Sequence, residues 1–367
     1  MINRCKNVGV MTFHFALNYG ARLQAYALQK YLEMQGYNVT VINYLPRRAQ
    51  FDIARTCVPL KPTNVLTSYY NLIRLNKFKD KIVSLNTSRI YRNLEELRRE
   101  PPKLDAYICG SDQIWNPNCS PNKDIQPYLL DFGLSNSKRL AYAVSLGNCP
   151  EAVLENTDFW SPLNSFNSIS VRESDAVSII QKLSRRKVDV CVDPTMLFAK
   201  SDYHRLFNFE KRRDSDRFFA YFLNPNTSEV TRLFQKFQSS GLYITQIFGG
   251  SFVRFKTSER IVPAPSGWVK SISEASGVIT NSFHGVVFSI IFNKRFLFLS
   301  LVGQEAKKNL RVAHLLNLLN LEERMISGQD LGDPVNLMLK PIDWLAVNKR
   351  VEQLSLQSKK FLDDALA

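Results

Sequence analysis

The pattern that most constrains this chain is a strand–helix–strand unit in its first fifty residues. Residues 8–13 form an apolar, strand-like run, and residues 38–43 form a second one. Between them, residues 21–35 place their apolar side chains on one helical face, and Gly36 follows as a helix-ending residue. A strand joined to the next strand through a helix is the module of a parallel sheet.

The same pattern continues along the chain and then repeats. The further strands expected are 106–109, 139–145, 168–172, 187–192, 218–223, 243–248, 277–281 and 296–300, and the later helices are 227–239 and 286–292. The charged stretch 200–216 between the two halves is interpreted as a linker. A length of 367 residues suffices for two domains.

We therefore predict an α/β fold of two Rossmann-like parallel-sheet domains that face a central cleft. The N-terminal domain is expected over 1–200, with an irregular basic insertion at 46–103, and the C-terminal domain over 201–340. A last segment, 341–367, is expected to form an amphipathic helix over 342–366 that packs back on the N-terminal domain. Ligands of such sheets bind beyond the carboxyl ends of the strands, so the loops that follow strands are the candidate site.

The charge of the chain points away from nucleic acid. Its 48 Lys and Arg exceed its 33 Asp and Glu by 15, but the basic residues alternate with acidic ones and no nucleic-acid-binding motif occurs. A peripheral contact with an anionic membrane fits this excess better. No apolar run reaches the ~18–20 residues of a membrane span. The first residues lack a signal-peptide pattern, so we expect a cytoplasmic protein, with peripheral contact at the inner face of the membrane.

The six cysteines occur singly, without a CxxC motif or a histidine at ligand spacing. We expect reduced core cysteines, as at Cys109, and no metal site.

The turn Asn281–Gly285 is the most informative candidate loop. It joins the end of a strand to the start of a helix, where backbone N–H groups face outward. Ser282 can cap the helix, and Gly285 lets a ligand approach the backbone. The helix dipole disfavours the cationic form of His284, and an arriving anion would favour it, which suits a proton carrier. The local alternative is an N-cap beside a half-buried histidine.

Two arginines are candidate anion ligands. Arg172 directly follows an apolar strand, and its guanidinium matches a phosphate or carboxylate group. The local alternative is a surface pair with Glu173 or Asp175. Arg311 begins a Leu-rich helix and is either a second anion contact or part of a solvated face.

Two loops of the N-terminal half suit a sugar. Asn18, Tyr19 and Gly20 precede the first helix, as a phosphate- or sugar-binding loop would. Asp112 and Gln113 combine hydrogen-bonding side chains with the aromatic ring of the nearby tryptophan. The alternative for this second loop is an Asx turn that closes a strand, with the tryptophan in the core.

Taken together, these loops resemble the polysaccharide pyruvyl transferase family. The matching segments occur in the family's order over roughly 7–320, namely 18–28, 110–116, 142–147, 170–173, 192–195 and 280–285. The chain departs from the family's pattern at Arg22, where a small or aliphatic residue is commoner, and at Asn281, where Asp is.

The resemblance implies a fold similar to GT-B glycosyltransferases, with the acceptor on the N-terminal domain and the donor on the C-terminal one. It implies transfer of the pyruvyl group of phosphoenolpyruvate onto two hydroxyls of a galactose-like sugar. The product would be a cyclic ketal on a bacterial capsule or exopolysaccharide precursor, expected to be lipid-linked, and phosphate would be released. No cofactor or metal besides this donor is expected.

The resemblance also implies roles for single residues. His284 is the expected acid/base residue, and Arg172 is a catalytic residue and donor ligand. The other donor-binding candidates are Ser282, Phe283, Gly285, Arg311 and Asn224, and the acceptor-binding candidates are Asn18, Tyr19, Gly20, Asp112 and Gln113. Two alternatives remain: a GT-B glycosyltransferase with a nucleotide-sugar donor, and a non-enzymatic scaffold that binds anions or glycans.

Overall fold

The computed structural model describes residues 6–59, 65–210, 217–223, 227–247 and 258–367. The chain divides into two compact units, described separately below. Unit 1 comprises Met1–Ile53, Ser84–Phe198 and Glu352–Ala367, and unit 2 comprises Ala54–Val83 and Ala199–Val351. Each unit contains one parallel sheet, so the predicted α/β class is confirmed. The expected cleft between the domains stays a prediction.

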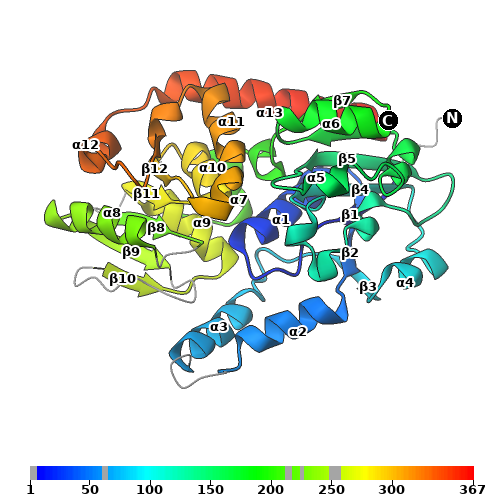
Figure 1. The fold of residues 1–367 in the computed structure, drawn as a ribbon, viewed down its shortest axis with the longest axis horizontal. Helices are drawn as coiled ribbons and strands as arrows, with labels where there is room; N and C mark the ends of the chain where they lie inside the picture. Colours follow the sequence, from blue (N-terminus) through cyan, green and yellow to red (C-terminus); the bar gives the residue numbers. More distant parts are fainter. Residues whose placement is uncertain (1–5, 60–64, 211–216, 224–226, 248–257) are drawn as a thin grey trace. The chain divides into compact units, whose positions relative to one another are not determined.

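Unit 1 is built on a seven-stranded parallel sheet of order β3-β2-β1-β4-β5-β6-β7 (Figure 1). Its strands are β1 Asn7–Met11, β2 Asn38–Tyr44, β3 Thr87–Tyr91, β4 Ala106–Asp112, β5 Lys138–Val144, β6 Ser168–Val171 and β7 Val188–Val190. All were expected except β3, which lies in the basic insertion and pairs with β2 at the edge of the sheet.

Helix α1, Tyr19–Met34, begins two residues earlier than predicted because the Asn18 side chain accepts a hydrogen bond from Ala21 N at 3.1 Å. The other helices of unit 1 are short: α4 Leu94–Arg99, α5 Glu151–Leu154, α6 Asp175–Ser184, and the 3₁₀ helices η2 Pro117–Cys119, η3 Pro121–Lys123, η4 Gln126–Leu129, η5 Ser161–Ser165 and η6 Pro194–Leu197. Trp115 is fully buried and packs edge-on against Trp160, with ring centroids 5.9 Å apart.

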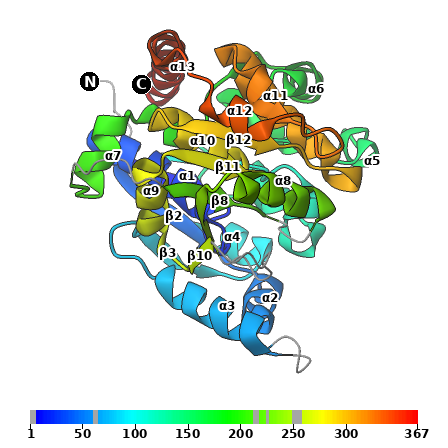
Figure 2. The same cartoon turned by 90° about the vertical axis from the view of Figure 1, so that its left-hand side faces the viewer.

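Unit 2 is built on a six-stranded parallel sheet of order β10-β9-β8-β11-β12-β13 (Figure 2). Its strands are β8 Arg217–Tyr221, β9 Tyr243–Ile247, β10 Ser258–Ile261, β11 Gly277–Thr280, β12 Arg295–Leu299 and β13 Met325–Ile326. Helices cover both faces. On one face Tyr221 contacts Trp268 of α9, which in turn contacts Phe288 of α10. On the other face Phe218 packs against Phe237 of α8.

The remaining helices have these bounds: α2 Arg47–Thr56, α3 Val65–Lys77, α7 Lys200–Leu206, α8 Ser228–Ser239, α9 Pro265–Glu274, α10 Phe283–Ile291, α11 Asn309–Leu319, α12 Pro334–Leu339 and α13 Trp344–Leu366, with the 3₁₀ helices η7 Gly303–Lys308 and η8 Glu322–Arg324. The stretch 200–216 is not wholly a linker, since α7 occupies its first half, and 211–216 lie outside the described residues.

Helix α13 confirms the predicted C-terminal helix. Its last part belongs to unit 1, where the Ser358 hydroxyl accepts a hydrogen bond from Val192 N at 2.9 Å. Among the described residues, no helix is long and apolar enough to cross a membrane. The described cysteines are all free, and Cys109 and Cys191 are buried, as expected for reduced core residues.

The strand orders locate the switch point of each sheet. Each sheet starts from a central strand, builds outward on one side and then continues on the other. The order therefore reverses between β1 and β4 in unit 1 and between β8 and β11 in unit 2. In open parallel sheets, ligands bind outside the carboxyl ends of the strands at this switch point.

Candidate functional site

The predicted donor turn lies at the switch point of unit 2. Asn281 directly follows β11, and its Oδ1 accepts a hydrogen bond from Leu223 N, just beyond β8, at 2.7 Å. Thr280 Oγ1 donates to Tyr221 O at 2.6 Å and accepts from Ser282 N at 3.0 Å. These bonds tie the turn across the two strands between which the order reverses.

Helix α10 begins at Phe283, three residues earlier than predicted, so His284 lies in its first turn and is only 6% exposed. Ser282 stands at the N-cap position, but its side chain makes no capping hydrogen bond, so the prediction of a side-chain cap is wrong. A Cβ on Gly285 would lie 2.5 Å from Thr280 Oγ1. The glycine therefore lets α10 lie directly against β11.

Arg311 lies next to this turn. Asn309, the first residue of α11, exchanges two hydrogen bonds with the backbone of Leu301, just beyond the carboxyl end of β12. Two residues later, the Arg311 guanidinium lies over the Phe283 ring, 5.7 Å from its centroid. This is a cation–π contact. The structure thus brings Arg311, Phe283 and His284 together, with an imidazole, a cation and a helix N-terminus at one edge of the sheet.

Arg172 in unit 1 is buried, with its side chain 3% exposed. Its Nη1 lies 2.8 Å from Asp193 Oδ2, and its Nε lies 3.5 Å from Glu173 Oε1. Burial acts to lower the pKa of Arg172, but the carboxylates of Glu173, Asp193 and Asp112 outweigh it and raise that pKa above its ordinary value. The local alternative is a surface pair with Glu173. Glu173 is indeed a partner, but the pair is buried.

The two carboxylates are held by further polar groups. Ser145 Oγ donates to Glu173 Oε1 at 2.6 Å, and Asp193 Oδ1 accepts from Thr195 N at 3.0 Å and Thr195 Oγ1 at 2.7 Å. One guanidinium thus faces two buried carboxylates. The sequence places Asp193 in the motif segment 192–195. Asp193 caps η6, but it also neutralises Arg172, a role that no local pattern signals.

Gln24 joins the switch-point strands of unit 1. Its Nε2 donates to Thr12 Oγ1, just after β1, at 2.8 Å, and its Oε1 accepts from Ser111 N, near the end of β4, at 3.1 Å. Sequence reasoning did not single out this residue. Its signal is a fully buried polar side chain on the inner face of α1.

The acceptor candidates lie at the carboxyl edge of unit 1 but carry structural roles there. Asn18 caps α1, and Tyr19 and Gly20 are buried in its first turn. Asp112 Oδ1 accepts from Gln113 N at 2.9 Å, so the side chain bonds the backbone of the next residue.

Asn224, a donor candidate, lies outside the described residues. Over the described ranges, no group of three or more His, Cys, Asp or Glu could hold a metal ion.

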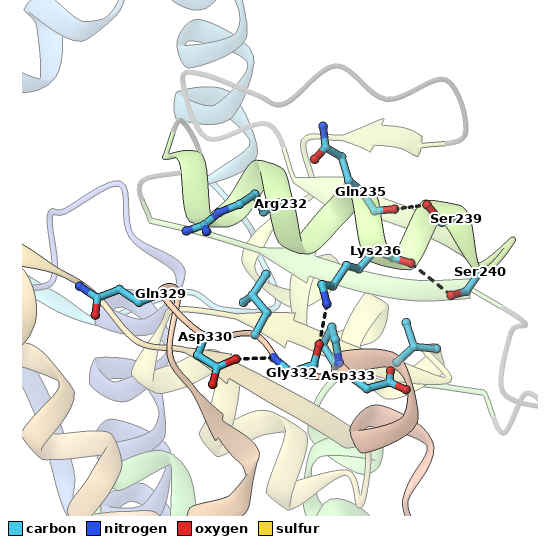
Figure 3. Close-up of a pocket in the computed structure, with 12 residues that line it drawn as sticks. Arg232, Gln235, Lys236, Ser239, Ser240, Gln329, Asp330, Gly332 and Asp333 are labelled. Carbon is cyan, nitrogen blue, oxygen red and sulfur yellow. Dashed lines mark hydrogen bonds between the residues drawn. The ribbon is translucent and has the colours of Figure 1, made fainter.

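A pocket of about 780 Å³ lies elsewhere on unit 2, between α8 and the loop after β13 (Figure 3). Arg232 and Lys236 of α8 donate to the backbone oxygens of Gly328 and Gly332, both at 2.6 Å. None of the predicted site residues lines this pocket, so the candidate chemistry and this hollow are separate features.

Comparison with known proteins identifies the family. The model of the family described as "Polysaccharide pyruvyl transferase" matches residues 18–301. This range contains all six motif segments and every candidate site residue except Arg311, which lies beyond its end. A search of the curated proteins gave no match.

Solved structures share the fold at low identity. A putative UDP-N-acetylglucosamine 2-epimerase from Listeria monocytogenes has a TM-score of 0.50 at 10% identity, with 96% of this chain and 91% of that chain covered. The glycotransferase of kitacinnamycin has a TM-score of 0.48 at 10% identity, with 98% and 96% covered. At 10% identity, the likeness to the epimerase shows a shared fold alone.

Proposed function

The chain belongs to the polysaccharide pyruvyl transferase family, and on this basis we propose that it transfers the pyruvyl group of phosphoenolpyruvate to a sugar. The acceptor is a galactose-like unit of a surface-polysaccharide precursor, and the product is a cyclic ketal that spans two of its hydroxyls. The acceptor is lipid-linked, and the protein works in the cytoplasm, in contact with the inner face of an anionic membrane.

One observation supports this proposal most directly. At the switch point of unit 2, His284 in the first turn of α10 lies beside Phe283, which the Arg311 guanidinium covers. A donor with a carboxylate and a phosphate needs a cation and a helix N-terminus to hold it. Its enol carbon needs a proton source, and a positioned histidine contributes typically ~10²–10⁴-fold in rate.

The reaction balances with one histidine as proton carrier. His284 delivers a proton to the CH₂ carbon of the donor, and the first sugar hydroxyl forms a C–O bond to C2 as it loses its proton. The C2–O bond to phosphate then breaks, and the second hydroxyl forms the other C–O bond and loses its proton. Two protons leave the hydroxyls. One replaces the proton used on carbon, and the other leaves with phosphate.

In this scheme Arg172 and Arg311 bind the donor, and Ser282, Phe283, Gly285 and Asn224 line its site. Asn18, Tyr19, Gly20, Asp112 and Gln113 face the acceptor. No metal or cofactor takes part. Arg172 is already paired with Asp193 and Glu173, so a donor anion would share its guanidinium with these carboxylates.

Thermal unfolding with ligands tests the donor. Phosphoenolpyruvate at 100 times its Kd adds about 2.7 kcal/mol of stability, and at about 2–4 °C per kcal/mol this raises Tm by roughly 5–11 °C. Pyruvate should give no shift. A shift with UDP-galactose and none with phosphoenolpyruvate would overturn the proposal in favour of a nucleotide-sugar glycosyltransferase.

Phosphate release with a galactoside acceptor then tests the catalytic residue. His284→Gln should lower kcat at least 100-fold without changing Tm by more than a few degrees. The matched control is His314→Gln, which removes a histidine from α11 one turn beyond Arg311. A His284→Gln variant with near wild-type kcat would show that His284 is not the proton carrier. Binding of phosphoenolpyruvate with no turnover on any sugar would favour the scaffold.

A further inference from the structure

The segment between β2 and β3 carries a surface that the proposed reaction does not use. Residues 47–83 hold eight Lys or Arg and two Asp, so about a tenth of the chain carries +6 of its +15 charge. Figures 1 and 2 both show α3 outside the helices α8, α9 and α10 that pack on the six-stranded sheet. Asn71 Nδ2 of α3 donates to Thr56 O, at the end of α2, at 2.9 Å.

Helix α3 turns an apolar stripe toward solvent. Val65, Tyr69 and Leu72 follow the i, i+4, i+7 spacing of one helix face, and they are 54%, 59% and 48% exposed. In an amphipathic helix of a globular protein such a stripe normally faces the core. Here the polar Ser68 is buried instead, at 5% exposure.

Two more exposed apolar residues flank α3 along the chain. Val58 precedes α3 and is 56% exposed, and Ile82 follows it and is 44% exposed. Single exposed apolar residues are ordinary, but a gathering of them marks an interaction site. We name the set the 58–82 surface; its members are Val58, Val65, Tyr69, Leu72, Ile82 and the lysines Lys77, Lys79 and Lys81, all of unit 2.

The three lysines of the 58–82 surface alternate along the chain at the end of α3. Lys77, Lys79 and Lys81 are all exposed. Within the described part of the chain, no ion pair involves any of them, although acidic residues engage other basic groups of the surface. Their charge is therefore available to a partner.

The residues between the lysines fix this segment to unit 2. Phe78 is 8% exposed and Val83 is fully buried. Asp80 Oδ2 accepts a hydrogen bond from Ser266 N, in the first turn of α9, at 2.8 Å. The carboxylate of Asp80 thus holds the segment to α9, while the three lysines on either side of it are exposed.

We propose that the 58–82 surface docks on an anionic lipid bilayer. The apolar side chains enter the boundary between headgroups and acyl chains, and the lysines reach the lipid phosphates along their flexible stems. A bilayer accepts apolar and cationic side chains at adjacent depths, which this surface offers together. A protein partner would need an apolar patch and an acidic patch in matching positions, whereas an anionic bilayer offers both over its whole surface. The inference deepens the proposed function, because a lipid-linked acceptor gives such docking its use.

Vesicle flotation tests the proposal without donor or acceptor, so its outcome is independent of whether pyruvyl transfer occurs. Vesicles of 30% phosphatidylglycerol in phosphatidylcholine should bind the protein, and pure phosphatidylcholine vesicles should bind it far more weakly. Each lysine near such a surface is worth about fivefold in partitioning, so Lys77→Gln/Lys79→Gln/Lys81→Gln should weaken binding on the order of 100-fold. Salt at 1 M should also weaken vesicle binding by the wild type, since it shortens the Debye length to about 3 Å.

Matched variants distinguish vesicle binding through the 58–82 surface from binding through the overall charge of the protein. Lys103→Gln/Lys349→Gln/Lys360→Gln removes the same charge elsewhere and should bind vesicles like the wild type. Tyr69→Ser/Leu72→Ser should lose at least tenfold with an unchanged Tm, whereas Leu345→Ser, at a side chain 85% exposed, should lose nothing. Equal losses in the two triple variants, or failure of the wild type to bind anionic vesicles, would overturn the proposal.

Discussion

The buried pairing of Arg172 makes a quantitative prediction about stability. The guanidinium and the Asp193 carboxylate are 3% and 0% exposed, and Glu173 lies on the other side of the guanidinium. Arg172→Met leaves two buried carboxylates without a cation, whereas Asp193→Asn leaves one guanidinium opposite one carboxylate. The charge of the cluster thus changes from −1 to −2 in the first variant and to 0 in the second.

These charges set the order of the effects. Breaking a buried pair by removing one partner costs about 3–5 kcal/mol, and Arg172→Met should reach the upper end of that range. Asp193→Asn keeps the acceptor for Thr195 and loses one charge-assisted hydrogen bond, so about 1.5–3 kcal/mol is expected. The double variant should be more stable than Arg172→Met alone, because it restores the charge of −1.

Urea unfolding followed by circular dichroism measures these differences as changes in midpoint. The matched control is Arg48→Met, which breaks a pair with Asp52 of 3.1 Å whose partners are 57% and 49% exposed. An exposed pair contributes less than about 1 kcal/mol. The reasoning is refuted if Arg172→Met is no more destabilising than Arg48→Met, or if the double variant is less stable than Arg172→Met.

Two further predictions concern packing and pH. Gly285→Ala should destabilise unit 2 by about 1–3 kcal/mol, because its Cβ would lie 2.5 Å from Thr280 Oγ1. Gly267→Ala, whose Cβ would lie 3.3 Å from Pro263 Cβ, should cost less in the same calorimetric scan. Burial lowers the pKa of His14 below its ordinary 6.5, outweighing hydrogen bonds to Asn43 and Thr12. The unfolded chain therefore binds a proton first as pH falls, so stability should decline below about pH 6.5. In the His14→Gln variant, the urea midpoint should depend less on pH between pH 7 and 5 than in the wild type. An equal dependence on pH in both proteins would show that His14 does not cause the decline.

Much of the fold follows from sequence periodicity, and the exceptions have physical reasons. The buried strands of a parallel sheet are short apolar runs, so β1, β4 and β11 stand out. Strand β3 is an edge strand whose side chains are mostly exposed or half-buried, with burial only at Tyr91. It therefore lacks a continuous apolar run. The Ser282 cap is a different case: its residue type and position are right, but its side chain makes no capping hydrogen bond.

The candidate site also has parts that the sequence could predict and a part that it could not. The positions of His284 and Arg311 were predictable, because each follows a strand of one parallel sheet and the carboxyl ends of those strands share an edge. The partner of Arg172 was not predictable. Asp193 lies 21 residues away along the chain, and the pair forms only because β6 and β7 are neighbours in the sheet, so that the residues beyond both strands meet.

The carboxyl edges of the two sheets carry different charges at their switch points, and this difference bears on how each would bind a substrate of the proposed reaction. In unit 1, one guanidinium faces two buried carboxylates, and Glu173 Oε2 makes no hydrogen bond to any described residue. A buried carboxylate oxygen of this kind is stabilised by a hydroxyl donor and repels an anion. In unit 2, Arg311 and the first turn of α10 supply positive charge. Of the two arginines proposed to bind the trianionic donor, Arg311 should therefore contribute more, because Asp193 and Glu173 already balance the charge of Arg172. A hydroxyl of the neutral acceptor is the better match for Glu173 Oε2.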